Sequence, residues 1–210
     1  IMSLPGDRDG LWKQISGKVR NQIRKAERRD VSVTIGGEEL TRDFHHVFST
    51  TMRDVGTPVY PRKLFHSILR NIPGAELVVV RCDGHLAAAA LLIHDEHNGI
   101  TQVPSAACLR QFNRDCVNMW MYQQLLNRAV ERGSVRFDFG RSTVDSGTYR
   151  FKKQWGAEPS PTCWQYMPRL GSIAQIRPDS GGYDRLIRTW QRLPVWLTRV
   201  LGPAVVRGIP

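Results

Sequence analysis

Apolar residues follow two different periods along this chain. In five segments they recur every three or four positions, which predicts amphipathic helices. These segments are 11–29, 38–54, 62–72, 113–132 and 148–155. In six shorter segments apolar residues alternate with polar ones or run together, which predicts strands. These are 31–35, 75–82, 85–94, 100–104, 135–139 and 162–167.

Turn residues and element order together indicate the fold. Asp83-Gly84 and Asn98-Gly99 are turn pairs that join three of the strands into an antiparallel meander. Residues 31–167 then predict, in order, a strand, two helices, the three meander strands, a long helix, a strand, a short helix and a strand. This is the element order of the GNAT acyltransferase fold, an α+β fold whose mixed, mostly antiparallel sheet is flanked by helices. In that fold the strands before and after the long helix splay apart to admit the acyl donor.

The other segments extend this GNAT-like domain of residues 31–167. Residues 1–30 predict a basic helix, because apolar positions form one stripe of 11–29 and Lys and Arg cover the rest. Residues 168–182 are rich in Gly, Pro and Ser and predict a linker. Residues 183–210 predict a basic amphipathic helical segment, broken at Pro194. Its tryptophans and arginines fit a helix lying in a membrane interface, and equally a helix packing back on the domain.

Charge and cysteine usage narrow the class of protein. The 210 residues carry a formal net charge of +11, which favours a polyanionic partner such as a nucleic acid, a nucleotide or an acidic membrane surface. Four cysteines without a CxxC pair are typical of a reducing compartment, so we expect a cytoplasmic protein, with peripheral attachment to the inner face of the membrane as an option. The longest apolar run, 86–93, is too short for a membrane-spanning helix.

Three stretches combine polar with aromatic residues: 20–26, 140–143 and 149–156. In the first, Arg20, Arg24 and Lys25 form either a phosphate-binding ridge or an ordinary solvated helix face. Asp138 ends a strand, where it is either an acid or base at a cleft or a carboxylate that caps the next loop.

Phe151 and Trp155, in the third stretch, are spaced to pack inward together, which would hold Lys152 on an anchored turn. Metal binding is not expected, since 94–97 lacks a helical HExxH spacing and reads as an exposed turn.

The runs KVRNQIRKAERRDVSV, FDFGRST and GTYRFKKQWGAEP resemble the FemAB-related peptidyltransferases, especially the branch associated with the PEP-CTERM exosortase and exopolysaccharide system. The resemblance implies two tandem GNAT-like halves, with residues 1–30 closing a first half that is mostly missing here. It also implies transfer of an acyl or aminoacyl group, from aminoacyl-tRNA or acyl-CoA, to an amine of an envelope glycan, an exopolysaccharide or a cell-wall precursor. No covalent enzyme intermediate and no tightly bound cofactor are implied.

Carried over to this sequence, the resemblance makes Lys152 the charge stabiliser near the reacting acyl group, with Asp138 or a water as proton acceptor. The amino end of the long helix, at Asn113, is a candidate phosphate seat. The other candidate substrate-binding residues are Arg141, Ser142, Thr143, Tyr149, Arg150, Lys153, Arg20, Arg24 and Lys25.

Two other functions compete with this interpretation. One is a small-molecule N-acyltransferase that uses acyl-CoA, although residues 106–113 lack the glycine-rich turn that usually binds CoA before the long helix. The other is a non-catalytic module that keeps the fold and binds tRNA or another polyanion through its charge.

Overall fold

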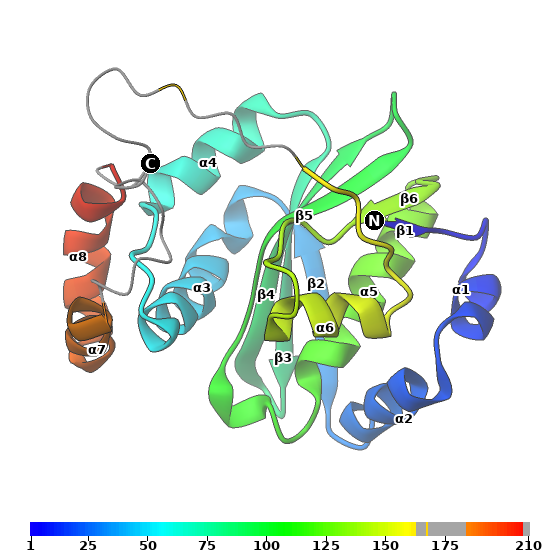
Figure 1. The fold of residues 1–210 in the computed structure, drawn as a ribbon, viewed down its shortest axis with the longest axis horizontal. Helices are drawn as coiled ribbons and strands as arrows, with labels where there is room; N and C mark the ends of the chain where they lie inside the picture. Colours follow the sequence, from blue (N-terminus) through cyan, green and yellow to red (C-terminus); the bar gives the residue numbers. More distant parts are fainter. Residues whose placement is uncertain (163–166, 168–183, 208–210) are drawn as a thin grey trace.

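The computed structural model describes residues 1–162, 167 and 184–207. One six-stranded sheet, in the order β1-β6-β5-β4-β3-β2, forms the middle layer (Figure 1). The strands are β1 (Met2–Ser3), β2 (Val31–Gly36), β3 (Ala75–Cys82), β4 (His85–Asp95), β5 (Ile100–Cys108) and β6 (Arg136–Asp138). All neighbouring strands are antiparallel except β5 and β6, which are parallel. This confirms the mixed, mostly antiparallel sheet. Most of the predicted strand 162–167, and the whole linker 168–182, lie outside the described residues.

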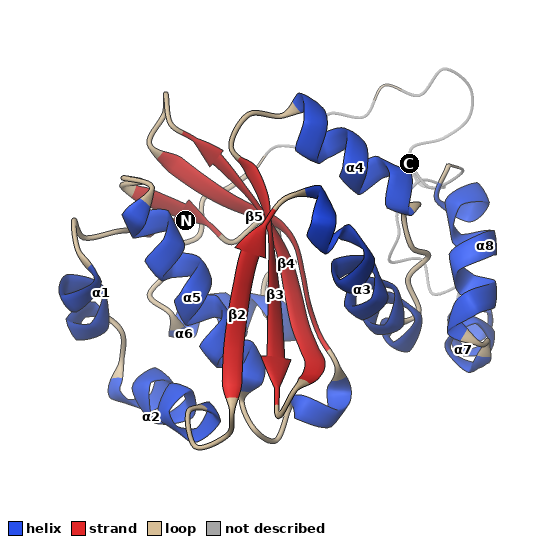
Figure 2. Cartoon of the chain, turned by 180° about the vertical axis from the view of Figure 1, so that it is seen from behind, coloured by secondary structure: helices blue, strands red, loops and turns tan. Residues whose placement is uncertain are grey.

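Helices cover both faces of the sheet (Figures 1 and 2). One face carries α3 (Thr41–Val55), α4 (Arg62–Asn71), α7 (Asp184–Arg192) and α8 (Val195–Val206). The other carries α1 (Arg8–Gln14), α2 (Gly17–Ala26), α5 (Val117–Glu131) and α6 (Gly147–Gln154). Two short 3-10 turns, Glu38–Leu40 and Arg110–Phe112, precede α3 and α5.

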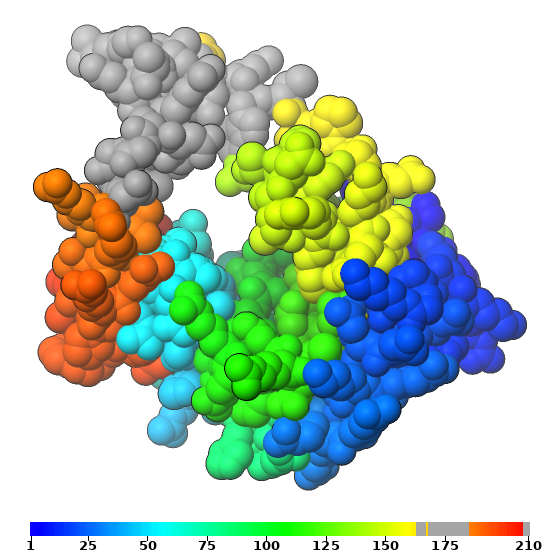
Figure 3. All heavy atoms as spheres, turned by 60° about the horizontal axis from the view of Figure 1, so that its bottom comes forward, coloured from blue at the N-terminus to red at the C-terminus, as the bar shows by residue number. Residues whose placement is uncertain are grey.

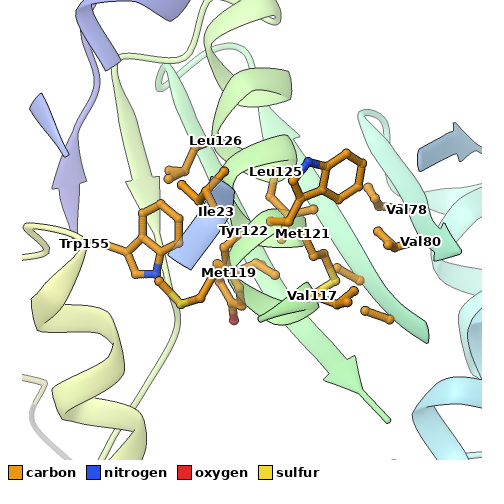
Figure 4. Close-up of a cluster of buried hydrophobic side chains, with 14 of the residues drawn as sticks. Ile23, Val78, Val80, Val117, Met119, Met121, Tyr122, Leu125, Leu126 and Trp155 are labelled. Carbon is orange, nitrogen blue, oxygen red and sulfur yellow. The ribbon is translucent and has the colours of Figure 1, made fainter. Parts of the chain in front are cut away.

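The alternation of side chains along the central strands produces two hydrophobic cores. Val78 and Val80 of β3 pack with the α1, α2 and α5 side, whereas Leu77 and Val79 pack with α3 and α4. Successive residues of a strand point to opposite faces, so a strand buried on both sides reads as a continuous apolar run. Figure 4 shows the first core, in which Leu125 and Met121 of α5 lie toward Val78 and Val80.

The prediction of one basic helix within residues 1–30 is wrong in its extent. The segment holds β1, α1 and α2, because Ile15 adopts an extended backbone and Ser16 caps a new helix by accepting a hydrogen bond from the Val19 amide. Side-chain oxygens of serine favour this cap position over a helix interior. Ile15, Val19 and Ile23 are buried in the same core as α5.

The C-terminal segment is helical on both sides of Pro194, as predicted. It packs back on the domain: Arg199 donates a hydrogen bond from Nε to the Ser49 hydroxyl at 2.8 Å, and Arg53 donates from Nη1 to the Leu193 carbonyl at 3.2 Å. Ser49 and Arg53 both belong to α3, so α3 anchors the pair α7 and α8.

Candidate functional site

The sheet opens between β5 and β6. The two strands are paired only from Ile100 with Arg136 to Gln102 with Asp138, while β5 continues to Cys108. Pro104 lies just past the last pair, within the irregular part of the β4–β5 ladder, and has no N–H to offer to a neighbouring strand. Figure 3 shows the surface hollowed between the cyan α3–α4 segment and the yellow-green segment that follows β6. The splayed strands expected from the element order are therefore present.

Lys152 holds the chain that leaves this opening. Its Nζ donates hydrogen bonds to the carbonyl oxygens of Gly140 at 2.7 Å and Arg141 at 2.8 Å. Gly140 has a φ of +75°, a conformation that glycine adopts at little cost. Burial lowers the pKa of Lys152, and the nearby charge of Asp138 opposes this shift. Lys152 is thus a half-buried, positioned cation.

Asp138 lies at the end of β6 and caps the same loop. Its Oδ1 accepts a hydrogen bond from the Gly140 amide at 2.7 Å. Its second oxygen, Oδ2, accepts none from the described residues. The capping role weighed from the sequence is therefore observed.

An aromatic cluster fixes the helix that carries Lys152. Tyr122 of α5 stacks on Phe139 with ring centroids 5.7 Å apart and meets Phe151 edge to face at 4.8 Å. Trp155 is buried at the end of α6 and lies toward α5 in Figure 4. Such aromatic pairs add to the stability gained from burying their area. The predicted inward packing of Phe151 and Trp155 is confirmed.

The remaining loop residues differ in exposure. Among the described residues, the buried hydroxyl oxygen of Ser142 has no hydrogen-bond partner. Tyr149 is half-buried, and its amide donates to Ser146, the residue that caps α6. The exposed candidates are Arg141, Thr143, Arg150 and Lys153.

The expected phosphate seat at Asn113 is wrong in its geometry. The long helix begins at Val117, four residues later, because the chain first makes the turn Arg110–Phe112 and then passes through Cys116 with a φ of +59°. Asn113 is an exposed turn residue.

The basic residues of α2 form a separate group. Arg24 lies over the Trp12 ring, 5.6 Å from its centroid, and Arg20 donates from Nη1 to the Trp12 carbonyl at 3.5 Å. Lys25 is exposed. No hydrogen bond or ion pair within the described ranges joins these residues to Lys152 or Asp138. The basic residues of α2 therefore make no direct polar contact with the two candidate catalytic residues.

Sequence reasoning missed a buried polar network at the other end of the meander. His94 bonds Thr101 through Nδ1 and Glu76 through Nε2, each at 2.7 Å. Arg128 of α5 donates hydrogen bonds to both carboxylate oxygens of Glu76, from Nε at 2.7 Å and from Nη2 at 2.8 Å. The expectation that His94 belongs to an exposed turn is wrong, since it is 3% exposed. The only sequence signal was its place at an inward position of the second meander strand.

In the part of the chain that the structure describes, no group of three or more His, Cys, Asp or Glu residues is arranged to hold a metal ion.

The comparisons with known proteins agree with the geometry. The acetyltransferase (GNAT) domain family matches residues 13–153. Among solved structures, FemX superposes with a TM-score of 0.65 at 18% identity, over 74% of this chain and 57% of FemX. An aminoglycoside N-acetyltransferase in complex with CoA superposes with a TM-score of 0.51 at 12% identity, over 68% of this chain and 97% of that one.

A third similar structure is the C-terminal domain of a lysylphosphatidylglycerol synthetase from Agrobacterium fabrum, assigned only provisionally to that activity. Its TM-score is 0.53 at 13% identity, over 67% of this chain and 51% of that one. This chain thus spans little more than half the length of FemX. No curated protein sequence matches it at a significant level.

The family match covers more than half of the 210 residues and includes β2 to β6, α5 and most of α6. Similarity to the solved structures confirms the predicted fold. The chain belongs to the acetyltransferase (GNAT) domain family.

Proposed function

We propose that this domain transfers an acyl or aminoacyl group to an amine of an envelope glycan, an exopolysaccharide or a cell-wall precursor, as FemAB-related enzymes do. The observation that carries the proposal is the opening between β5 and β6, next to a loop held by Lys152. The sequence resemblance supports the branch associated with the PEP-CTERM system. The similarity to FemX supports the fold on which such transfer takes place.

The opening suits a linear donor. Among the residues that the structure describes, no strand pairs with β5 beyond Gln102 on the β6 side, and we assign the backbone groups of this edge to contact with an extended chain. We assign this edge to the acyl end of aminoacyl-tRNA or of acyl-CoA. The chain's positive charge favours either phosphate-bearing donor.

Transfer then needs one bond to form and one to break. The neutral acceptor amine attacks the acyl carbonyl carbon, and the ester or thioester bond to the donor breaks as the tetrahedral intermediate collapses. Lys152 stabilises the developing oxyanion, directly or through the loop amides that it holds in place. Asp138, through Oδ2 or a water, accepts the proton that the amine loses, and the leaving hydroxyl or thiol regains one.

Binding of candidate donors and acceptors tests the proposal. The thermal stability of the chain is measured with aminoacyl-tRNA, a series of acyl-CoAs and nucleotide-linked sugars, at low and at high salt. A ligand that binds only the folded state raises the melting temperature by mass action. We expect a shift with one donor class that survives high salt, because a shaped site does not depend on charge alone.

Two outcomes would contradict the proposal. A shift with CoA thioesters alone, together with acetylation of small amines, favours the small-molecule N-acyltransferase. Shifts that every polyanion produces and that high salt abolishes favour the non-catalytic polyanion-binding module.

A further inference from the structure

We propose that the outer face of α7 and α8 binds the surface of an anionic lipid bilayer. The outer face is defined by the exposed residues Arg185, Leu186, Arg192, Trp196 and Val200. The inference concerns a surface outside the β5–β6 opening and does not depend on the proposed transfer reaction.

Contacts on the opposite side set the orientation of this face. Thr198 and Gly202 of α8 are buried, and a Cβ built on Gly202 would lie 2.7 Å from the Val59 carbonyl oxygen. Gln191 donates from Nε2 to the Asp54 carbonyl oxygen at 3.2 Å, which adds to the bonds made by Arg199 and Arg53. The pair is therefore docked through one side, at the edge of the molecule in Figure 2, and its other side points away.

The side of α8 that points away is apolar where a water-facing helix would be polar. Trp196 is 65% exposed and Val200, one turn further along α8, is 68% exposed. Leu186 of α7 is 65% exposed. Large exposed apolar patches mark interaction sites, because leaving this area in water forgoes about 25 cal/mol per Å².

The positive charge of α7 and α8 indicates which partner this face binds. Within residues 185–207 no residue is acidic and four arginines are exposed, Arg185, Arg188, Arg192 and Arg207, whereas Arg199 bonds Ser49 on the docked side. A second copy of this chain would bring arginines against arginines across a symmetric contact, which disfavours self-association through this face. A bilayer with anionic headgroups complements the arginines while accepting the apolar side chains, and tryptophan favours that interface.

The dimensions fit a helix pair lying in the plane of the membrane. None of the helices that the structure describes combines the length and apolar character needed to cross a bilayer. Arg185 and Arg192 are exposed on α7, so in this orientation their guanidinium groups reach headgroup phosphates while Trp196 and Val200 of α8 enter the acyl boundary.

Vesicle co-sedimentation of the 210-residue chain tests the proposal. Phosphatidylglycerol vesicles are compared with phosphatidylcholine vesicles, at low and at high salt. We expect binding to phosphatidylglycerol, weakened by salt, and about tenfold weaker binding for the double variant Arg185→Glu, Arg192→Glu. A variant carrying Trp196→Ser and Val200→Ser should also lose binding, whereas Trp196→Phe should keep it.

Matched controls separate this face from the overall charge. Arg42→Glu with Lys63→Glu, both exposed on α3 and α4, makes the same change in net charge and should bind much better than the α7 double variant. Val135→Ser removes an exposed apolar side chain elsewhere and should bind like the unaltered chain. Equal binding to both lipids, equal losses in the two charge variants, or burial of Trp196 by self-association in solution would each overturn the proposal.

Discussion

The Nζ atom of Lys152 lies 2.7 Å from the carbonyl oxygen of Gly140, so α6 holds the loop that leaves the opening of the sheet. The same ammonium group reaches the Arg141 carbonyl oxygen, which satisfies two backbone acceptors in one turn. A charge placed in this way stabilises the loop, and the proposed reaction gives it a second role, stabilisation of the oxyanion. The two roles of Lys152 can be separated by experiment.

Lys152→Met keeps the apolar stem and removes the ammonium group. We expect kcat/KM for transfer to fall about 100-fold, since one preorganised charge stabiliser is lost. The free energy of unfolding should fall by about 1 kcal/mol, because two carbonyl oxygens lose their donor. Lys63→Met, on an exposed lysine of α4, should change neither quantity. A Lys152→Met variant that loses stability but keeps full kcat/KM would show that the lysine acts on the loop alone.

Asp138→Asn distinguishes a capping residue from a proton acceptor. The amide oxygen can still accept from the Gly140 amide, so the melting temperature should be unchanged. The amide is not basic, so kcat should fall about 100-fold. Full activity in this variant would leave Asp138 as a cap and assign proton transfer to another group.

Glu76 makes stability depend on pH. Burial raises its pKa, but hydrogen bonds from Arg128 and His94 outweigh this and lower the pKa to about 2, from a usual value of 4.5. A carboxylate with a lowered folded pKa stabilises the fold above its unfolded pKa and loses this effect as the pH falls through the folded value.

Glu76→Gln should therefore reduce the free energy of unfolding by about 2 kcal/mol near neutral pH. The difference from the unaltered chain should shrink as the pH falls from 4.5 to about 2. Urea unfolding across this range measures it. Glu27→Gln, an exposed carboxylate at the end of α2, is the control and should show a small difference at every pH. If the difference in free energy of unfolding between Glu76→Gln and the unaltered chain stayed constant across this pH range, the ion pair with Arg128 would contribute little.

Gly202→Ala tests how α8 is docked. Its Cβ would come within 2.9 Å of the Val59 amide nitrogen and 2.7 Å of the Val59 carbonyl oxygen, so the helix must move away. We expect a loss of about 1 to 3 kcal/mol, typical of overpacking, and faster proteolysis near α8. Gly17→Ala, at the start of α2, meets only the end of the Arg20 side chain at 4.0 Å and should not destabilise the protein. Equal stability of both variants would contradict the tight contact between α8 and Val59.

Local patterns were enough to predict most secondary structure. The Asp83-Gly84 pair has φ angles of +50° and +75°, the turn expected between two antiparallel strands, and β3 and β4 flank it. Ser16 was a different case, because a cap in the middle of an amphipathic stretch competes with continuation of the helix. The periodicity placed Ile15, Val19 and Ile23 on one helical stripe, and all three are buried in the structure, but it did not reveal the break between α1 and α2.

The candidate site was predicted only where it depends on residues close together in the sequence. Lys152, Phe151 and Trp155 lie within one turn of helix, so their spacing predicted an anchored lysine. Its acceptors at Gly140 and Arg141 lie more than ten residues away, and no local pattern encodes that contact. Asn113 was misplaced because the chain makes a 3-10 turn and a left-handed step at Cys116 before the helix begins.

The sequence by itself determined what short-range sterics and periodicity control: the meander, the long helix, the break at Pro194 and the positive charge. Only the tertiary structure decided that β1 pairs with β6, that His94 is buried against Glu76, and that β5 and β6 separate after Gln102. These features join residues far apart in the chain. Their free energy comes from packing and hydrogen bonds that exist only once the sheet and its helices are assembled.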